Sequence, residues 1–309
     1  MIPHNRYSLH ILASAVFGAA GQLVSEIAFR RTEISALEFA TVSNIVGGAF
    51  LLVIARMRGT SESLSWSRVD LTRLAMASTA MYAIGFLLAY EAIDLIGVSK
   101  FSLLGRLEVV FIVALAVWFL GESWSLKHWL ATLSAVFGAA LTNLHPEDWQ
   151  LQVGRGEVLT VLSTMVFAGG IVALKPLLHR QDGKIVTGAG LLIGATMLAP
   201  ALLLESGAAV QRAVLTSPLA LLLVAFRGVL LAMSWVTFNV AIVHIGASRG
   251  SAIFLTIVPF TVIMQLVTSE LAPSIGLRVP ENLSIALIGG AIVLGAVLVI
   301  QRQQIQVAE

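Results

Sequence analysis

The sequence predicts an all-α membrane protein with ten transmembrane helices, arranged as a 5+5 inverted-topology repeat. Three observations predict this fold class. The chain is 58% apolar and 12% charged, with a mean hydropathy of +0.92, whereas soluble domains carry about 25% charge. Its apolar runs are long enough to cross a bilayer, which takes about 20 residues. One segment of the first half also recurs in the second half.

The composition excludes several function classes. A soluble enzyme with so few charged residues could not cover its own surface, and the 19 Lys and Arg residues are too scattered for a nucleic-acid interface. The absence of cysteine excludes disulfides, thiolate metal ligands and cysteine nucleophiles. No metal-ligand spacing or phosphate-binding loop is present. We therefore expect no metal, no cofactor, no nucleic-acid partner and no ATP hydrolysis by this chain.

The expected spans are helices, because backbone groups in lipid must pair within their own segment. The breaks between them are short and hold most of the Arg, Lys, Pro and Asp residues. In chain order the ten expected spans are 8–29, 35–56, 71–93, 98–120, 126–144, 156–178, 185–206, 217–243, 247–271 and 283–301.

The orientation follows from the basic residues in the loops. If the N-terminus is inside, ten Lys and Arg residues fall in cytoplasmic segments and six in outer segments. Positively charged loops stay in the cytoplasm, so we expect both termini there and the protein in the cell (inner) membrane. The basic cluster from Arg56 to Arg73 is the strongest support for this orientation. The Arg30–Arg31 pair, which would lie outside, weakly favours the opposite orientation.

An internal repeat divides the chain into two halves, residues 1–149 and 150–309. The segment 92–102 aligns with 241–251, and six of its eleven positions are identical. Each half holds five spans, and five is odd, so the second half must enter the membrane from the opposite side. Inverted repeats of this kind build secondary transporters, with the substrate site near the midplane.

Three charged residues fall near the middle of their spans, which is costly unless they face a cavity or a partner. Arg106 shares a helix stripe with Ser99 and Ser102, so we expect it on a cavity wall. Glu108 points elsewhere, and we expect it to face a neighbouring helix, where it could pair with Arg227. The alternative is a buried salt-bridge network with no substrate role.

Aromatic and amide side chains on the other spans could complete a small-ligand pocket, although helix packing explains any single one of them equally well. Glu108 and Glu91 are the candidates for proton coupling or gating, and the remaining substrate-binding candidates are Tyr82, Tyr90, Trp235, Asn239, Asn44 and Gln265.

The residues of the repeat resemble the drug/metabolite transporter superfamily, EamA-like branch. The resemblance rests on Ala92, Gly97 and Ser99, on the segment Leu103–Phe111, and on the Phe-Leu-Gly-Glu sequence at 119–122. The second half repeats the pattern with Ala241, Gly246, Ser248, Ile257–Phe260 and a weaker Ser269-Glu270. Two departures are the absence of a proline before Phe111 and a longer loop at 272–281. The resemblance implies a ten-helix secondary carrier, commonly an exporter of small metabolites.

From these residues we expect a transporter and not an enzyme. Two arginines at the midplane favour a small amphipathic substrate with a carboxylate, such as an amino acid or organic acid. An organic-cation or drug efflux carrier is the first alternative, in which the acids matter. A membrane-embedded lipid-handling protein or enzyme is the alternative from another class. The expected partners are the small substrate, a proton and the lipid bilayer; the oligomeric state stays open.

Overall fold

The computed structural model describes residues 5–58, 66–121, 125–141, 153–205 and 213–278, and short stretches between 284 and 299. Of the residues that the structure describes, 90% are helical and none is in a strand. The helices of the first half are α1 (Asn5–Arg31), α2 (Ala36–Met57), α3 (Arg68–Ser78), the π-helix η1 (Thr79–Gly85), α4 (Phe86–Ile96), α5 (Val98–Leu104), α6 (Leu107–Leu120) and α7 (Leu126–Leu141). Those of the second half are α8 (Arg155–Leu178), α9 (Gly183–Glu205), α10 (Ala213–Thr216), α11 (Pro218–Ile245), α12 (Ala247–Phe254), α13 (Ile257–Leu271) and the 3-10 turn η2 (Pro273–Ile275).

Eight helical segments of the described chain are long and apolar enough to cross a membrane. They correspond to the expected first four spans and to the sixth through ninth. The helix expected as the fifth span, α7, is shorter at 16 residues. Within the expected tenth span the described positions between 284 and 299 are helical, but much of that segment lies outside the described residues, as does Glu122. The structure thus shows a multi-pass helical membrane fold with eight candidate spans.

Local sequence signals set several helix starts. Ser35, Ser67 and Ser217 each precede a helix, and each hydroxyl accepts a hydrogen bond from the backbone N–H three residues later. Such caps satisfy donors that the first helical turn leaves unpaired. Pro218 follows Ser217 at the first helical position, where its missing N–H costs nothing.

Two spans are interrupted in the same way. A short turn at Gly105–Arg106 separates α5 from α6, and a turn at Leu255–Thr256 separates α12 from α13. Each interrupted span begins after a glycine with positive φ: Gly97 has φ 76° and ψ 163°, and Gly246 has φ 90° and ψ 153°. That backbone region is essentially restricted to glycine. The aligned segments 92–102 and 241–251 therefore adopt the same backbone geometry.

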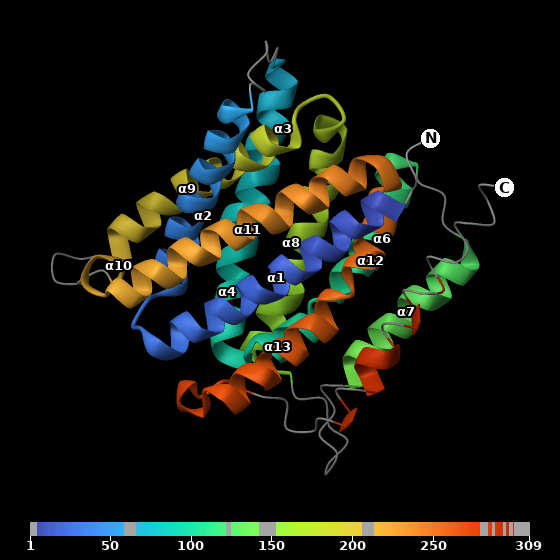
Figure 1. Ribbon diagram of the computed structural model, residues 1–309. Helices are drawn as coiled ribbons and strands as arrows, with labels where there is room; N and C mark the ends of the chain where they lie inside the picture. Colours follow the sequence, from blue (N-terminus) through green and yellow to red (C-terminus); the bar gives the residue numbers. More distant parts are fainter. Residues whose placement is uncertain are drawn as a thin grey trace.

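The bundle pairs helices from the two halves. α1 packs along α11, and the two lie side by side across the face shown in Figure 1. Ser14 and Ser234 join them with reciprocal bonds: each hydroxyl donates to the other residue's carbonyl, at 2.8 and 2.9 Å. α2 packs against α9, α5 against α13 and α6 against α12. α7 lies apart from α1 and α11, beside described C-terminal residues (Figure 1).

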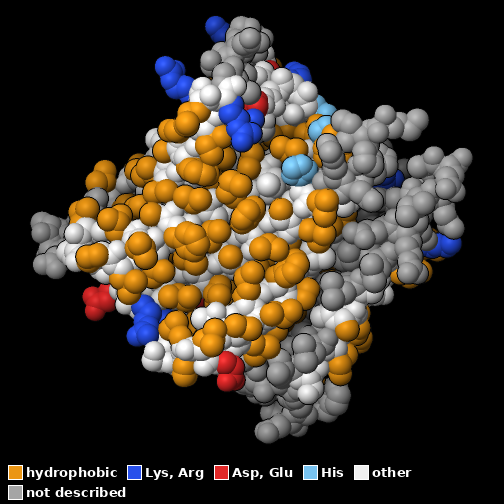
Figure 2. Space-filling view, in the orientation of Figure 1, with side chains coloured by type: hydrophobic (Ala, Val, Ile, Leu, Met, Phe, Trp, Pro, Cys, Tyr) orange, Lys and Arg blue, Asp and Glu red, His pale blue; other side chains and the backbone are white. Residues whose placement is uncertain are grey.

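The outer face of the bundle is apolar. Figure 2 shows hydrophobic side chains covering the flank formed by α1, α11 and α13, with charged side chains near its margins. Leu222, Phe226 and Ile263 on this surface are 66%, 54% and 54% exposed. A soluble protein rarely exposes so continuous an apolar surface, and a lipid environment explains it.

Candidate functional site

A cavity of about 90 Å³ lies at the centre of the bundle. Its wall combines α1, α4, α8 and α11 with both interrupted spans, so both halves of the chain contribute. Most lining side chains are apolar or aromatic. The exceptions include two arginines and one glutamate, Arg106, Arg227 and Glu108. An apolar cavity with a few polar groups is typical of a small-ligand site.

Arg106 lies at the turn that separates α5 from α6. Its side chain is 3% exposed, and its Nε donates to the carbonyl of Ser102 at 2.7 Å. The guanidinium carbon lies 5.8 Å from the centre of the Phe254 ring, a distance at which a cation is attracted to the ring face. Nη1 is buried and has no hydrogen-bond partner.

Arg227 reaches the cavity from α11. It is 6% exposed, and its Nε donates to the hydroxyl of Ser25 at 3.2 Å. The guanidinium lies 5.6 Å from the centre of the Tyr90 ring, and its Nη1 also lacks a partner. Gly21 makes room for it, because a Cβ at that position would lie 2.9 Å from Nη1. Each arginine thus has one satisfied nitrogen, one aromatic neighbour and one unsatisfied donor.

Glu108 lies on the wall of the same cavity, on the first turn of α6. The sequence led us to expect it against a neighbouring helix, paired with Arg227. The structure differs: it has no ion pair between Glu108 and Arg227, nor between Glu108 and Arg106, within 4.0 Å. The turn at Gly105–Arg106 explains the difference, because the regular helix phase assumed for residues 99–108 is broken there.

Tyr90 and Trp235, two of the aromatic candidates, line the cavity. Trp235 lies at the centre of an aromatic cluster, with ring centroids 6.4 Å from Phe86, 6.2 Å from Phe167 and 5.8 Å from Phe238. Phe167 and Phe254 were not expected from the sequence, nor were Thr164 and Ser251. Ser251 could have been suspected from the sequence, because it is the position in the second half that aligns with Ser102 in the internal repeat.

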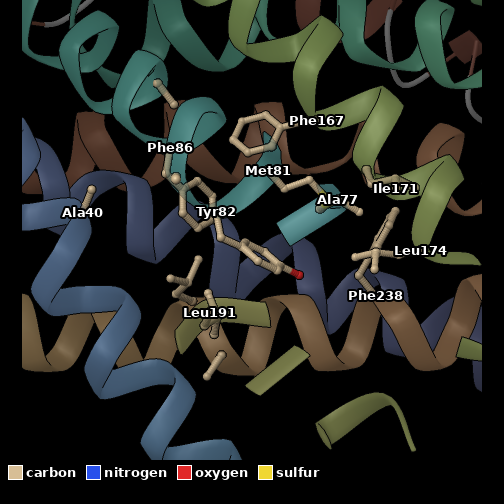
Figure 3. Packing of buried hydrophobic residues seen from close by; sticks show 14 of the residues in the cluster. Ala40, Ala77, Met81, Tyr82, Phe86, Phe167, Ile171, Leu174, Leu191 and Phe238 are labelled. Carbon is tan, nitrogen blue, oxygen red and sulfur yellow. The ribbon is translucent and has the colours of Figure 1, made fainter. Parts of the chain in front are cut away.

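Tyr82, Asn44 and Asn239 do not border the cavity. Tyr82 is fully buried one layer behind Phe86, among residues such as Leu191 and Phe238 (Figure 3). Asn44 donates to the Tyr82 carbonyl at 2.6 Å, and Asn239 donates to the Thr187 hydroxyl at 2.7 Å. The structure places these three in contacts between helices.

Gln265 also lies outside the cavity wall, in a cluster that joins the two halves. We call Glu26, Val98, Ser99, Gln265 and Arg278 the Glu26 cluster. Glu26 is fully buried and accepts three hydrogen bonds: from the Val98 N–H at 3.0 Å, the Arg278 N–H at 2.9 Å and Gln265 Nε2 at 2.9 Å. Ser99 donates its hydroxyl to Gln265 Oε1.

The Glu26 cluster lies directly beyond one end of the cavity. Ser14, Gly18 and Gln22 line the cavity from one face of α1, and Glu26 is the next residue in that spacing of four, about 6 Å further along the axis. Arg278 links this cluster to the end of α4, since its side chain donates to the Asp94 carbonyl at 2.7 Å and to the Leu95 carbonyl. Burial lowers the pKa of Arg278, and the Asp94 and Glu26 carboxylates oppose that shift.

Glu91 lies away from both the cavity and the Glu26 cluster. It forms an ion pair with Arg155 at 3.0 Å, in which the side chains are 40% and 75% exposed. Exposed pairs of this kind contribute little to stability. In the residues that the structure describes, no group of three or more His, Asp or Glu side chains is placed to hold a metal ion.

The described residues form a helical bundle with a central cavity and an apolar outer surface, which is compatible with a membrane transporter. Residues 6–144 match the family described as the EamA-like transporter family, part of the drug/metabolite transporter superfamily. This match confirms, over the first half of the chain, the resemblance stated from the sequence, and together with the eight apolar helices it indicates a multi-pass membrane protein.

The comparison with solved structures supports the fold. One crystal structure superimposes with a TM-score of 0.72 over 99% of this chain and 99% of its own, at 13% sequence identity. At that identity the likeness concerns the fold alone. In the comparison with curated proteins, nothing matches.

Proposed function

We propose that the protein is a secondary active carrier that exports a small amphipathic metabolite with a carboxylate, such as an amino acid or organic acid. The observation that carries this proposal is the pair Arg106 and Arg227. They come from different halves of the chain, line one cavity and each keep an unsatisfied Nη1. A buried donor without a partner is costly, and a bound carboxylate would satisfy both.

The size and lining of the cavity favour a small substrate. A volume of about 90 Å³ is well below the several hundred Å³ of a site for drug-sized ligands. The aromatic cluster around Trp235 would receive the apolar part of such a molecule, while the arginines hold its carboxylate. Charged hydrogen bonds of this kind are about twice as strong as neutral ones.

We further propose that residues 1–149 and 150–309 form two inverted five-helix halves. Movement of these halves relative to each other would expose the central cavity alternately to the two sides of the membrane. The matching turns at Gly105–Arg106 and Leu255–Thr256, and the matching glycines Gly97 and Gly246, support the repeat. Interrupted helices beside a central site are typical of such carriers. In this proposal α7 and the helical positions between 284 and 299 complete the count of ten, and both termini are cytoplasmic.

The Glu26 cluster supports the same mechanism, because it joins the halves beyond one end of the cavity. For the substrate to pass that end, the three hydrogen bonds to Glu26 must break. Glu108 is the proposed coupling residue. Its carboxyl group lines the cavity without an ion-pair partner in the described chain and can take up a proton.

A transport assay in proteoliposomes tests the proposal. The purified protein is reconstituted, and the uptake of labelled amino acids and short organic acids is measured in exchange mode. We expect exchange of at least one such compound, and its loss in Arg106→Ala and Arg227→Ala. Normal exchange by both variants would show that the site assignment is wrong. Arg155→Ala, at an exposed arginine on α8, is the matched control.

One observation favours a second candidate, an organic-cation carrier. Glu108 is a carboxylate in an aromatic cavity, and both acids and ring faces attract cations. The two candidates differ in their inhibitors. Competition by organic cations but not by amino or organic acids, with loss of transport in Glu108→Gln, would favour the cation carrier.

A further inference from the structure

A groove of about 470 Å³ runs along the outside of the bundle between α3 and α8, remote from the central cavity. Arg68, Thr72 and Arg73 line it near the start of α3, and Met76, Ala77 and Ala173 line it further along. Val69 is also part of its wall. The groove belongs neither to the cavity nor to the Glu26 cluster.

The two arginines of the groove have no acidic partner in the described chain. One ion pair at this end of the bundle joins the nearby Asp70 to Arg180 at 3.4 Å, and neither of these residues lines the groove. Figure 2 shows basic side chains gathered at this end of the molecule, where α3 begins. The groove therefore presents two uncompensated positive charges at the margin of the apolar surface.

The depth of the groove matches the layers of a lipid leaflet. Arg68 begins the candidate span Arg68–Ile96, so it lies at headgroup level. Arg73 follows about 7.5 Å along the helix axis and Met76 about 12 Å along it. The aliphatic stem of a half-buried arginine can lie along apolar surface while its charge reaches the headgroups. Val69 and Met76 are 65% and 69% exposed, although they are apolar.

We propose that this groove binds an anionic phospholipid, with its phosphate between Arg68 and Arg73 and an acyl chain along Met76, Ala77 and Ala173. Basic pockets between transmembrane helices recognise such headgroups. The groove combines two guanidinium groups with an apolar wall formed by Met76, Ala77 and Ala173. An acyl chain would cover this wall, whereas a free phosphate would leave it uncovered, so we favour a lipid over a free phosphate. A zwitterionic lipid would not compensate the two charges.

A lipid titration tests the proposal. The detergent-purified, delipidated protein is titrated with phosphatidylglycerol or phosphatidylcholine, and the bound lipid is counted by native mass spectrometry. Each basic residue near a membrane contributes about 1 kcal/mol to binding anionic lipid, so Arg68→Gln/Arg73→Gln should bind phosphatidylglycerol about 30-fold more weakly than the wild type. Arg56→Gln/Arg58→Gln removes the same charge at the same end outside the groove, and should bind as the wild type does.

A second variant distinguishes lipid binding in the groove from a general attraction of anionic lipid to basic residues at this end of the protein. Ala173→Trp keeps both arginines but fills the apolar floor, and it should also lose the preference for phosphatidylglycerol. Glycerol phosphate at equal concentration should not displace the lipid. Equal binding by the wild type and Arg68→Gln/Arg73→Gln, or an equal loss in Arg56→Gln/Arg58→Gln, would overturn the proposal. Displacement by glycerol phosphate at equal concentration would also overturn it, because the headgroup alone would then explain the binding.

Discussion

Arg106 and Arg227 line the same cavity from opposite halves of the chain, and each guanidinium lies over an aromatic ring, at 5.8 Å from Phe254 and 5.6 Å from Tyr90. In both residues Nε is held by a neighbour while Nη1 has no partner. The held nitrogens fix the orientation of the guanidinium groups. The unpartnered Nη1 atoms are the donors that the proposed carboxylate would satisfy.

The space beside Arg227 gives the first prediction. A methyl group at position 21 would lie 2.9 Å from Arg227 Nη1, so Gly21→Ala should displace the guanidinium and weaken substrate binding about tenfold, the value of one lost charged hydrogen bond. A binding titration checks this. Gly169→Ala is the control, because a Cβ at that position would meet nothing within 4 Å. Equal weakening in both variants would contradict the prediction.

Glu108 gives a prediction about energy coupling. Glu108→Gln keeps the shape of the side chain but cannot carry a proton, so an imposed proton gradient should no longer drive accumulation. Substrate exchange without a gradient should persist, because the arginines remain. Flux in proteoliposomes with and without the gradient measures both. Glu91→Gln, at the exposed ion pair with Arg155, should behave as the wild type, and gradient-driven accumulation by Glu108→Gln would show that coupling lies elsewhere.

The Glu26 cluster gives a prediction about access. Glu26→Gln removes the charge that strengthens three hydrogen bonds, each worth about 1.5–3 kcal/mol to a charged acceptor. The cavity should then open more often toward this end. Because the chain has no native cysteine, Ser251→Cys on the cavity wall can report access through labelling by an impermeant maleimide added from that side.

The expected result is labelling several-fold faster in the Glu26→Gln background than in the parent. Gln265→Ala removes another member of the cluster and should act in the same direction. Glu33→Gln, an exposed acid at the same end of the bundle, is the control. Unchanged labelling in both cluster variants would mean that the cluster does not close the cavity.

The two positive-φ glycines give a stability prediction. Gly97 and Gly246 hold φ 76° and 90° with ψ near the extended value, so an alanine at either position should cost about 1–3 kcal/mol. The backbone strain should raise the cost at both positions, and at Gly97 an added Cβ would in addition lie 2.8 Å from the Cβ of Arg278. Unfolding in detergent with increasing denaturant measures them. Gly169→Ala within α8 should stabilise slightly or do nothing, and a neutral result for Gly97→Ala would contradict the strain assigned to this turn.

The sequence predicted the helical membrane fold because span length and apolar composition are local properties. The serine caps at the starts of α2, α3 and α11 are also a local signal, although the expected span boundaries did not make use of it. The turn at Gly105–Arg106 was not predictable from periodicity, since residues 98–120 read as one continuous apolar run. That turn changed the placement of Glu108.

The charged residues of the cavity were identified from their position near the middle of the predicted spans. An arginine at that depth in the membrane is expected to face a cavity or a partner and not lipid. Depth could not separate Tyr82 from Tyr90, which lie on the same stripe two turns apart but in different layers of the bundle. Glu26 could not be singled out from the sequence, because an acid so near a helix end is usually an ordinary interface charge. Its partners come from residues 98, 265 and 278, and no local pattern reveals contacts so distant in the sequence.

The central claim is that Arg106 and Arg227 together bind a carboxylate in the cavity between the halves. The most direct test titrates the purified protein with amino acids and short organic acids, each paired with its own carboxamide, which lacks only the negative charge. We predict that the wild type binds at least one acid tenfold or more tightly than its amide, the difference expected when a charged hydrogen bond is lost. We also predict that Arg106→Gln and Arg227→Gln lose this preference while Arg155→Gln keeps it. Equal affinity for acid and amide in the wild type, or an unchanged preference in both cavity variants, would contradict the claim.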